Sequence, residues 1–140
     1  RHVFGQRHNF CPNSKNYQRL DSELVEKLAQ HYADNPHIVV WHVNNEYGGN
    51  CYCGNCQNAF RDWLRNKYKT LGALNKAWNM NVWSHTIYDW DEIVVPNELG
   101  DAWGPESSEA IVAGLSIDYL RFQSESLQNL FKMEKAVIKK

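Results

Sequence analysis

The feature that most restricts the fold of this chain is a single short run of apolar and β-branched residues at positions 38–43, Ile-Val-Val-Trp-His-Val. The run lacks the alternation of a half-exposed strand and is short for a helix. Such a pattern is typical of a parallel strand that is covered on both faces. It is the one convincing interior strand pattern, and one strand cannot make a sheet. The sequence therefore predicts part of a fold that is completed by chain beyond these 140 residues.

Amphipathic helical patterns lie on both sides of this run. A helix is predicted to start after a cap at Asn13 or Ser14 and to end at residues 34–36, Asp-Asn-Pro. Further helices are predicted over residues 56–69, 71–79 and 118–139, with an irregular stretch over 80–115. Because Val3 and Phe4 have the pattern of an earlier strand end, the order is strand, helix, strand, helix. This order predicts an α/β fold with parallel strands and crossover helices.

Composition excludes several classes of function. The 15 basic and 16 acidic residues give a formal net charge of -1, which argues against binding to nucleic acid or to a membrane surface. No apolar run approaches the length that a membrane span requires. Aromatic residues are abundant, with six Trp and seven Tyr, and such residues often line sites for sugars.

Glu46 follows directly after the predicted strand, in the loop Asn44-Asn45-Glu46-Tyr47. In α/β folds, ligands bind at the carboxyl ends of the strands. A partly desolvated carboxyl there would have a raised pKa and would suit general acid catalysis. Position alone leaves two readings open, a general acid or a glutamate in a surface loop.

The four cysteines suggest a metal site. Cys51, Cys53 and Cys56 form the pattern C-x-C-x2-C, and Cys11 supplies a fourth thiol. Four thiolates suit a structural Zn²⁺ ion with tetrahedral coordination. Disulfides and free buried thiols are the alternatives; a bridge between Cys51 and Cys53 would close a strained ring.

Three segments resemble glycoside hydrolase family 42, the β-galactosidases with a (β/α)8 TIM barrel. Residues 41–48, Trp-His-Val-Asn-Asn-Glu-Tyr-Gly, resemble the acid/base segment of the family, and the cysteine cluster follows it. Residues 7–14, Arg-His-Asn-Phe-Cys-Pro-Asn-Ser, resemble the segment after the third strand, and residues 81–84, Asn-Val-Trp-Ser, resemble a segment beyond the fourth helix. The resemblance implies that residues 1–140 are a partial catalytic barrel domain, truncated at both ends. It would run from about the end of strand three through helix four and the following long loop and helix.

The same resemblance implies roles for individual residues. Glu46 would be the acid/base of a retaining β-galactosidase, with the nucleophile outside this chain. Arg7, Asn45 and Trp83 would bind the β-galactoside substrate. A structural zinc would be held by Cys11, Cys51, Cys53 and Cys56.

For the whole protein the family implies a homo-oligomer, often a trimer, and reduced zinc thiolates favour the cytoplasm. The 140-residue piece alone is expected to be inactive. Two other classes stay open: a zinc-stabilised carbohydrate-binding module without catalysis, and a zinc-ribbon interaction module. Both predict cooperative unfolding of the isolated chain, whereas an open piece of barrel predicts marginal stability.

Overall fold

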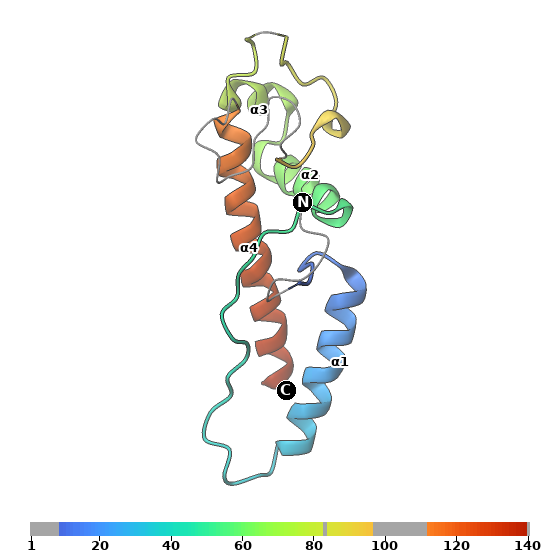
Figure 1. Cartoon of the computed structure of the whole chain (residues 1–140), viewed down its shortest axis with the longest axis vertical. Helices are drawn as coiled ribbons and strands as arrows, with labels where there is room; N and C mark the ends of the chain where they lie inside the picture. The colour runs from blue at the N-terminus through green and yellow to red at the C-terminus, as the bar shows by residue number, and fades with distance from the viewer. Residues whose placement is uncertain (1–8, 83, 97–111, 140) are drawn as a thin grey trace.

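The computed structural model describes residues 9–82, 84–96 and 112–139, and within them it contains helices and irregular chain. The elements, in chain order, are α1 (Lys15–Tyr32), α2 (Gly54–Tyr68), α3 (Leu71–Trp78), the 3₁₀ turn η1 (Trp90–Glu92) and α4 (Ala113–Ile138). Figure 1 shows α4 running along most of the length of the molecule, with α1 beside its C-terminal part and the shorter elements gathered around its N-terminal part.

Side-chain caps set the starts of two helices. The Ser14 hydroxyl accepts a hydrogen bond from the Tyr17 amide at 3.3 Å and caps α1, as predicted. Thr70 caps α3 in the same way, through the Ala73 amide at 3.2 Å. Each hydroxyl satisfies one of the amides that a helix start leaves without an intrahelical partner.

The last helix begins earlier than the sequence predicts. It starts at Ala113, whereas the apolar spacing placed its start near Asp118. Gly114 lies within its first turn. In the structure a Cβ at Gly114 would lie 2.4 Å from Trp78 Cδ1, so the missing side chain lets α4 approach α3 closely.

The core lies where α2, α3 and α4 meet. Phe60 and Leu64 of α2 are fully buried, as is Tyr119 of α4. The Phe60 ring meets Tyr119 edge-on at 4.9 Å and Phe122 at 5.3 Å between centroids. This aromatic cluster packs one face of α2 against α4.

The prediction of a buried strand at residues 38–43 was wrong for the described structure. Within the described residues no strand forms, and residues 38–43 are extended but unpaired. Val39 is 92% exposed and Val40 is 78% exposed. The β-branched pattern sets the local conformation, but burial of a parallel strand depends on strands to either side, and the described residues provide none.

The helices and this extended segment nevertheless have the arrangement of βα units. Asn13, just before α1, contacts Ser126 of α4, and Asp21, further along α1, contacts Glu134, further along α4. The two helices therefore run parallel. The segment after α1 runs the opposite way along α4, in the direction shown in Figure 1. Its contacts pass from Glu134 to Gln123 as its own numbering rises from Tyr47 to Cys51.

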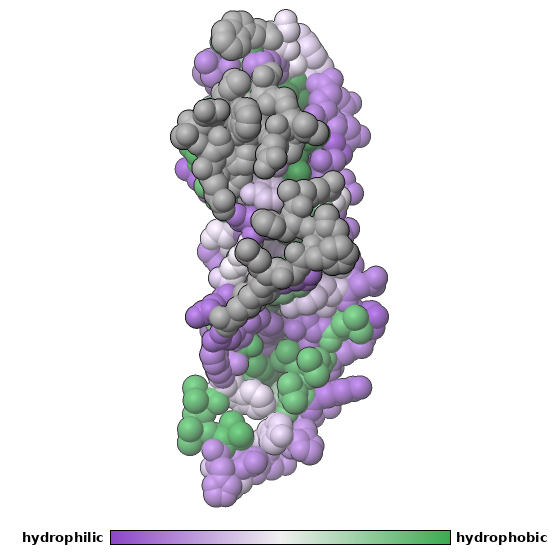
Figure 2. Space-filling model, viewed as in Figure 1, coloured by the Kyte–Doolittle hydropathy of each residue, from purple (hydrophilic) through white to green (hydrophobic). Residues whose placement is uncertain are grey.

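Apolar side chains remain at the surface of the α1 end. They include Leu20 at 55% and Leu24 at 58% exposed, on the face that the helical spacing predicts to be apolar. Figure 2 shows apolar groups among polar ones over the lower half of the molecule, where α1 and the segment after it lie. None of the helices in the described ranges has both the length and the apolarity to span a bilayer.

Candidate functional site

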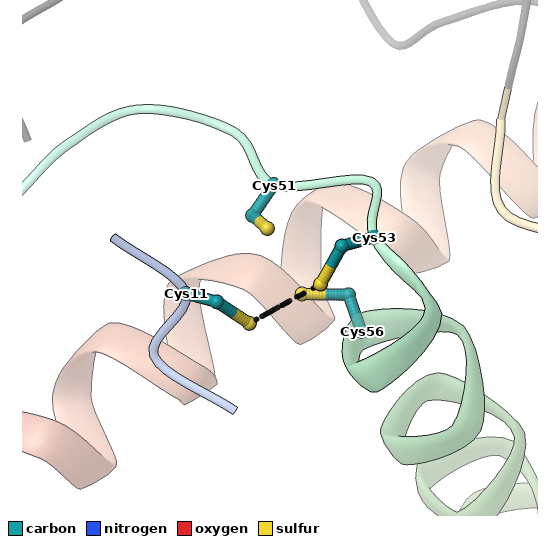
Figure 3. Close-up of side chains that lie close together, drawn as sticks. All are labelled: Cys11, Cys51, Cys53 and Cys56. Carbon is teal, nitrogen blue, oxygen red and sulfur yellow. Dashed lines mark hydrogen bonds between the residues drawn. The ribbon is translucent and has the colours of Figure 1, made fainter. Parts of the chain in front are cut away.

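The four cysteines converge at the junction of three parts of the chain. Cys11 comes from the loop before α1, Cys51 from the extended segment, Cys53 from the N-cap of α2 and Cys56 from the first turn of α2. Their sulfur atoms all lie within 4.8 Å of one another. Figure 3 shows the side chains pointing toward a common centre beside α4.

The sulfur geometry fits a metal ion and not a disulfide. Cys11 Sγ lies 3.5 Å from both Cys56 Sγ and Cys53 Sγ, and all four cysteines are free. Bonded sulfurs would be about 2.05 Å apart. Sulfurs around one tetrahedral ion, at about 2.3 Å from it, are about 3.8 Å from one another. The arrangement can therefore hold a metal ion with no position left open for water.

The surroundings favour negative charge on one of the four sulfurs, that of Cys51, whereas the pKa values of Cys11 and Cys56 are raised. Cys53 and Cys56 lie at the N-terminal end of α2, where the helix dipole stabilises anions. Hydrogen bonds from the Cys11 and Cys56 thiols hold the pKa of Cys51 well below its ordinary value. The pKa of Cys11 is raised, chiefly because its thiol donates to Cys51. Crowded thiols that share protons in this way are poised to release them to a cation.

Two residues of α4 hold the backbone of Cys51, and sequence reasoning missed both. The Cys51 amide donates to Gln123 Oε1 at 3.1 Å, and the Tyr119 hydroxyl donates to the Cys51 carbonyl. Gln123 is 4% exposed, which is unusual for this residue type. Their spacing of four on one helix face is a weak signal that no local pattern distinguishes from ordinary packing.

The predicted substrate site is only partly described, although the loop that carries Asn45 and Glu46 is described in full. Asn45 and Glu46 are exposed, so the described residues do not provide the desolvation expected for the Glu46 carboxyl. Glu46 has a φ of 53°, in the left-handed region that non-glycine residues rarely adopt. Arg7 and Trp83, the other predicted substrate-binding residues, lie outside the described residues.

Tyr47, directly after Glu46, contacts α4. Its hydroxyl donates to Glu134 Oε2, and its ring meets Phe131 edge-on at 6.2 Å between centroids. Glu134 is 2% exposed, and the sequence analysis did not single it out. A lone Glu in the polar pattern of a long helix gives no signal of burial.

This arrangement of helices and loop indicates the class of fold. Two parallel helices with an extended segment running opposite to them, and an acid at the loop end of that segment, are the elements of a (β/α)8 barrel. The computed structure matches the crystal structure of a β-galactosidase from Bacillus circulans sp. alkalophilus with a TM-score of 0.89 and 56% identity, over 97% of this chain and 20% of that one. It matches that of a cold-adapted β-galactosidase from Rahnella sp. R3 with a TM-score of 0.87 and 39% identity, over 99% and 19%. The chain has an α/β fold, as part of a TIM barrel, in agreement with the sequence analysis.

Sequence comparison identifies the family. The family model of glycoside hydrolase family 42, described as "Beta-galactosidase", matches residues 1–140, and the chain belongs to this family. Beta-galactosidase LacZ of Lactobacillus acidophilus is 83% identical over 140 residues, and Beta-galactosidase LacA of the same species is 80% identical. The match covers the whole of this chain and 21% of each of these relatives. The chain thus spans about a fifth of the length of the curated relatives it matches.

Proposed function

We propose that this chain is a partial catalytic barrel domain, residues 1–140, of a retaining β-galactosidase, and that it carries the acid/base of that enzyme. The observation that carries the proposal is the family match over the whole chain, with relatives of up to 83% identity that are named β-galactosidases. The alternative of a carbohydrate-binding module without catalysis is not favoured, because the matched relatives are named as enzymes.

In the proposed mechanism Glu46 acts twice. It first protonates the glycosidic oxygen as the bond to the galactosyl carbon breaks, and a carboxylate about 5–5.5 Å away takes up the sugar as a covalent intermediate. Glu46 then accepts a proton from the water that hydrolyses the intermediate. The nucleophile lies on a later strand of the barrel, outside this chain.

Three further residues position the sugar in this proposal. Asn45 donates a hydrogen bond to a sugar hydroxyl, at a contact that strengthens in the transition state. Arg7 offers its fork of donors to the same sugar, and Trp83 offers an apolar platform. The substrate is a terminal β-D-galactoside.

The cysteine cluster is proposed to hold a structural zinc ion. Four soft thiolates in a closed tetrahedral arrangement suit Zn²⁺, and the ion would supply crosslinking and not chemistry. Cys11 lies in the same segment as Arg7, while Cys51, Cys53 and Cys56 follow Glu46. Binding one ion therefore ties together the two segments that carry the sugar-binding Arg7 and the acid.

The proposal extends to the whole protein. The reduced thiolates of a zinc site fit the cytoplasm, and the near-zero net charge of this chain fits a protein that binds neither nucleic acid nor membranes. We further propose a homo-oligomer, as a trimer, for the full-length enzyme.

The decisive experiment is Glu46→Gln in the full-length enzyme, with a chromogenic β-galactoside as substrate. Loss of the acid is expected to lower kcat/KM by roughly 10²–10⁴-fold for a substrate with a poor leaving group. Glu23→Gln, at a half-exposed position on α1 paired with Arg19, is the matched control and is expected to have no effect. Full turnover by the Glu46 variant would disprove the catalytic role.

Elemental analysis of the purified enzyme tests the metal separately. About one zinc per chain is expected, and substitution of any one of the four cysteines by serine should release it. A zinc content near zero in protein with intact thiols would contradict this part of the proposal.

A further inference from the structure

Glu134 gathers both residues that flank the Asn45-Glu46 pair. The Tyr47 hydroxyl donates to its carboxylate, and the Asn44 side chain hydrogen-bonds the same group. Asn44 precedes the pair and Tyr47 follows it, so one buried carboxyl holds the loop on both sides of the proposed acid. Glu134 is 2% exposed. A buried carboxyl requires hydrogen-bond partners, and the Asn44 amide and the Tyr47 hydroxyl provide them.

The position of Glu134 is itself fixed from a second helix. Asp21 of α1 hydrogen-bonds the Glu134 carboxyl, so the contact lies in the interface between α1 and α4. Burial raises the pKa of both carboxyls, and the neighbouring charge of Asp21 adds to the effect at Glu134. The Tyr47 ring also rests against Phe131, one turn before Glu134 on α4. The anchor is therefore part of the packed pair of helices α1 and α4 and not of the loop.

The loop needs such an anchor. Glu46 has a φ of 53°, a conformation that persists in a non-glycine residue only when its surroundings impose it. After Tyr47 come Gly48 and Gly49, which have no side chains to hold the backbone, and Gly49 has a φ of 82°. Contacts at Asn44 and Tyr47 thus restrain a segment whose own sequence permits wide movement.

We propose that Glu134 is a positioning residue for Glu46: by holding Asn44 and Tyr47 it fixes the backbone between them, and so aims the Glu46 carboxyl at the glycosidic oxygen. This inference rests on the proposed role of Glu46 as acid/base. Glu134 does not touch substrate. Its effect appears only in steps that depend on proton delivery, because a proton donor displaced by about 1 Å loses much of its effect.

The test uses the full-length enzyme and two aryl β-galactosides. Dinitrophenolate leaves without protonation, whereas phenol requires the proton from Glu46. The measured quantity is kcat/KM, which reports the step that cleaves the glycosidic bond. Tyr47→Phe removes the donor to Glu134 and keeps the ring against Phe131. It is expected to lower kcat/KM on the order of 10–100-fold for the phenyl substrate and by less than about 3-fold for the dinitrophenyl substrate.

Two Glu134 variants complete the series. Glu134→Gln keeps an acceptor for Tyr47, and it is expected to retain more activity toward the phenyl substrate than Glu134→Ala. If Glu134→Ala does not fold, the comparison of Tyr47→Phe with the parent decides. Glu23→Gln on α1 again serves as the control that should leave both substrates unaffected.

The outcomes separate the two proposals. If Glu46→Gln shows the leaving-group dependence but Tyr47→Phe lowers both substrates equally, or neither, the positioning role is wrong and the proposed function stands. If Glu46→Gln itself shows no leaving-group dependence, the proposed function fails. The inference is supported only when both variants discriminate against the phenyl substrate.

Discussion

Asn13 Nδ2 lies 3.5 Å from Cys56 Sγ and donates to it, across 43 residues of sequence. The same amide nitrogen lies 3.2 Å from Ser126 Oγ on α4, and Ser126 donates to the Phe122 carbonyl at 2.8 Å. One amide thus joins a candidate metal ligand to the longest helix. Groups that hydrogen-bond a ligand atom orient it and tune its affinity for the metal.

Asn13→Ala should therefore weaken metal binding by about 10–100-fold without removing a ligand. The measurement is competition for zinc with a chromogenic chelator, using the full-length protein. Asn16→Ala, at an exposed position in the first turn of α1, is the matched control and should bind zinc like the parent. Equal affinities for the two variants would contradict the role of Asn13.

Gly114→Ala should destabilise the junction of α3 and α4. The added methyl would lie 2.4 Å from Trp78 Cδ1 and 3.1 Å from its Cα, and backbone cannot move aside as a flexible side chain would. Overpacking of this kind costs about 1–3 kcal/mol in the free energy of unfolding. Gly72→Ala in α3 has its nearest neighbour at 4.0 Å and should be neutral or slightly stabilising. Urea denaturation of the two variants checks this; similar midpoints would refute it.

Asp118 of α4 should stabilise the fold above its pKa. Burial raises the pKa of its carboxyl, but donated hydrogen bonds outweigh burial and lower it below the ordinary 3.8. The donors are Lys67, Tyr68 at 2.6 Å and Trp78 at 3.1 Å. Because the unfolded state binds the proton more tightly, the stabilisation is present above pH 3.8 and is lost as the pH falls through the lowered pKa.

Asp118→Asn should lower the free energy of unfolding at neutral pH by about 1.5–3 kcal/mol, the contribution of hydrogen bonds to a charged group. It should also remove part of the acid sensitivity. Asp62→Asn, whose side chain is 71% exposed beside Arg65, should change stability by less than about 1 kcal/mol. Urea midpoints at neutral and acid pH separate these expectations.

The Glu134 and Asp21 pair should give the opposite pH dependence. Burial raises the pKa of Glu134 above the ordinary 4.5, and the neighbouring charge of Asp21 adds to the effect. The ionisable groups that face the pair are the hydroxyls of Tyr17 and Tyr47. The folded state therefore holds a proton that the unfolded state releases, so this part of the stability is complete below pH 4.5 and falls as the pH rises through the folded value.

Glu134→Gln should flatten this decline, because the amide cannot ionise. Urea midpoints measured between about pH 4 and 8 test this, with Glu23→Gln as the exposed control. An unchanged slope in the Glu134 variant would show that ionisation of Glu134 does not cause this pH dependence.

Much of the helical structure could be predicted because it is local. Ser14 caps α1 as predicted, and the helix predicted over residues 56–69 forms as α2, with Phe60 and Leu64 on its buried face. The prediction was wrong at the start of α4, which begins at Ala113 and not near Asp118. Gly114 in the first turn allows close contact with Trp78, and no local sequence pattern reveals this contact.

The features of the candidate site that could not be predicted from the sequence depend on long-range contacts. The convergence of the four sulfurs was predicted from cysteine spacing and is confirmed by the structure. The amide and hydroxyl groups around them, from Asn13, Tyr119 and Gln123, were not predicted. These residue types are common on helices and loops, and only the packing of α4 against the cluster distinguishes them. The roles of Glu46, Asn45, Arg7 and Trp83 stay predictions.

The unpaired segment at residues 38–43 has a practical consequence for anyone who expresses this stretch of chain by itself. Val39 and Val40 present 92% and 78% of their surface to solvent, beside backbone amides and carbonyls with no sheet to join. An open, β-branched edge of this kind is a template for pairing between molecules. When residues 1–140 are expressed alone, we expect the protein to accumulate in inclusion bodies. The substitution Val39→Lys should increase the amount of protein in the soluble fraction.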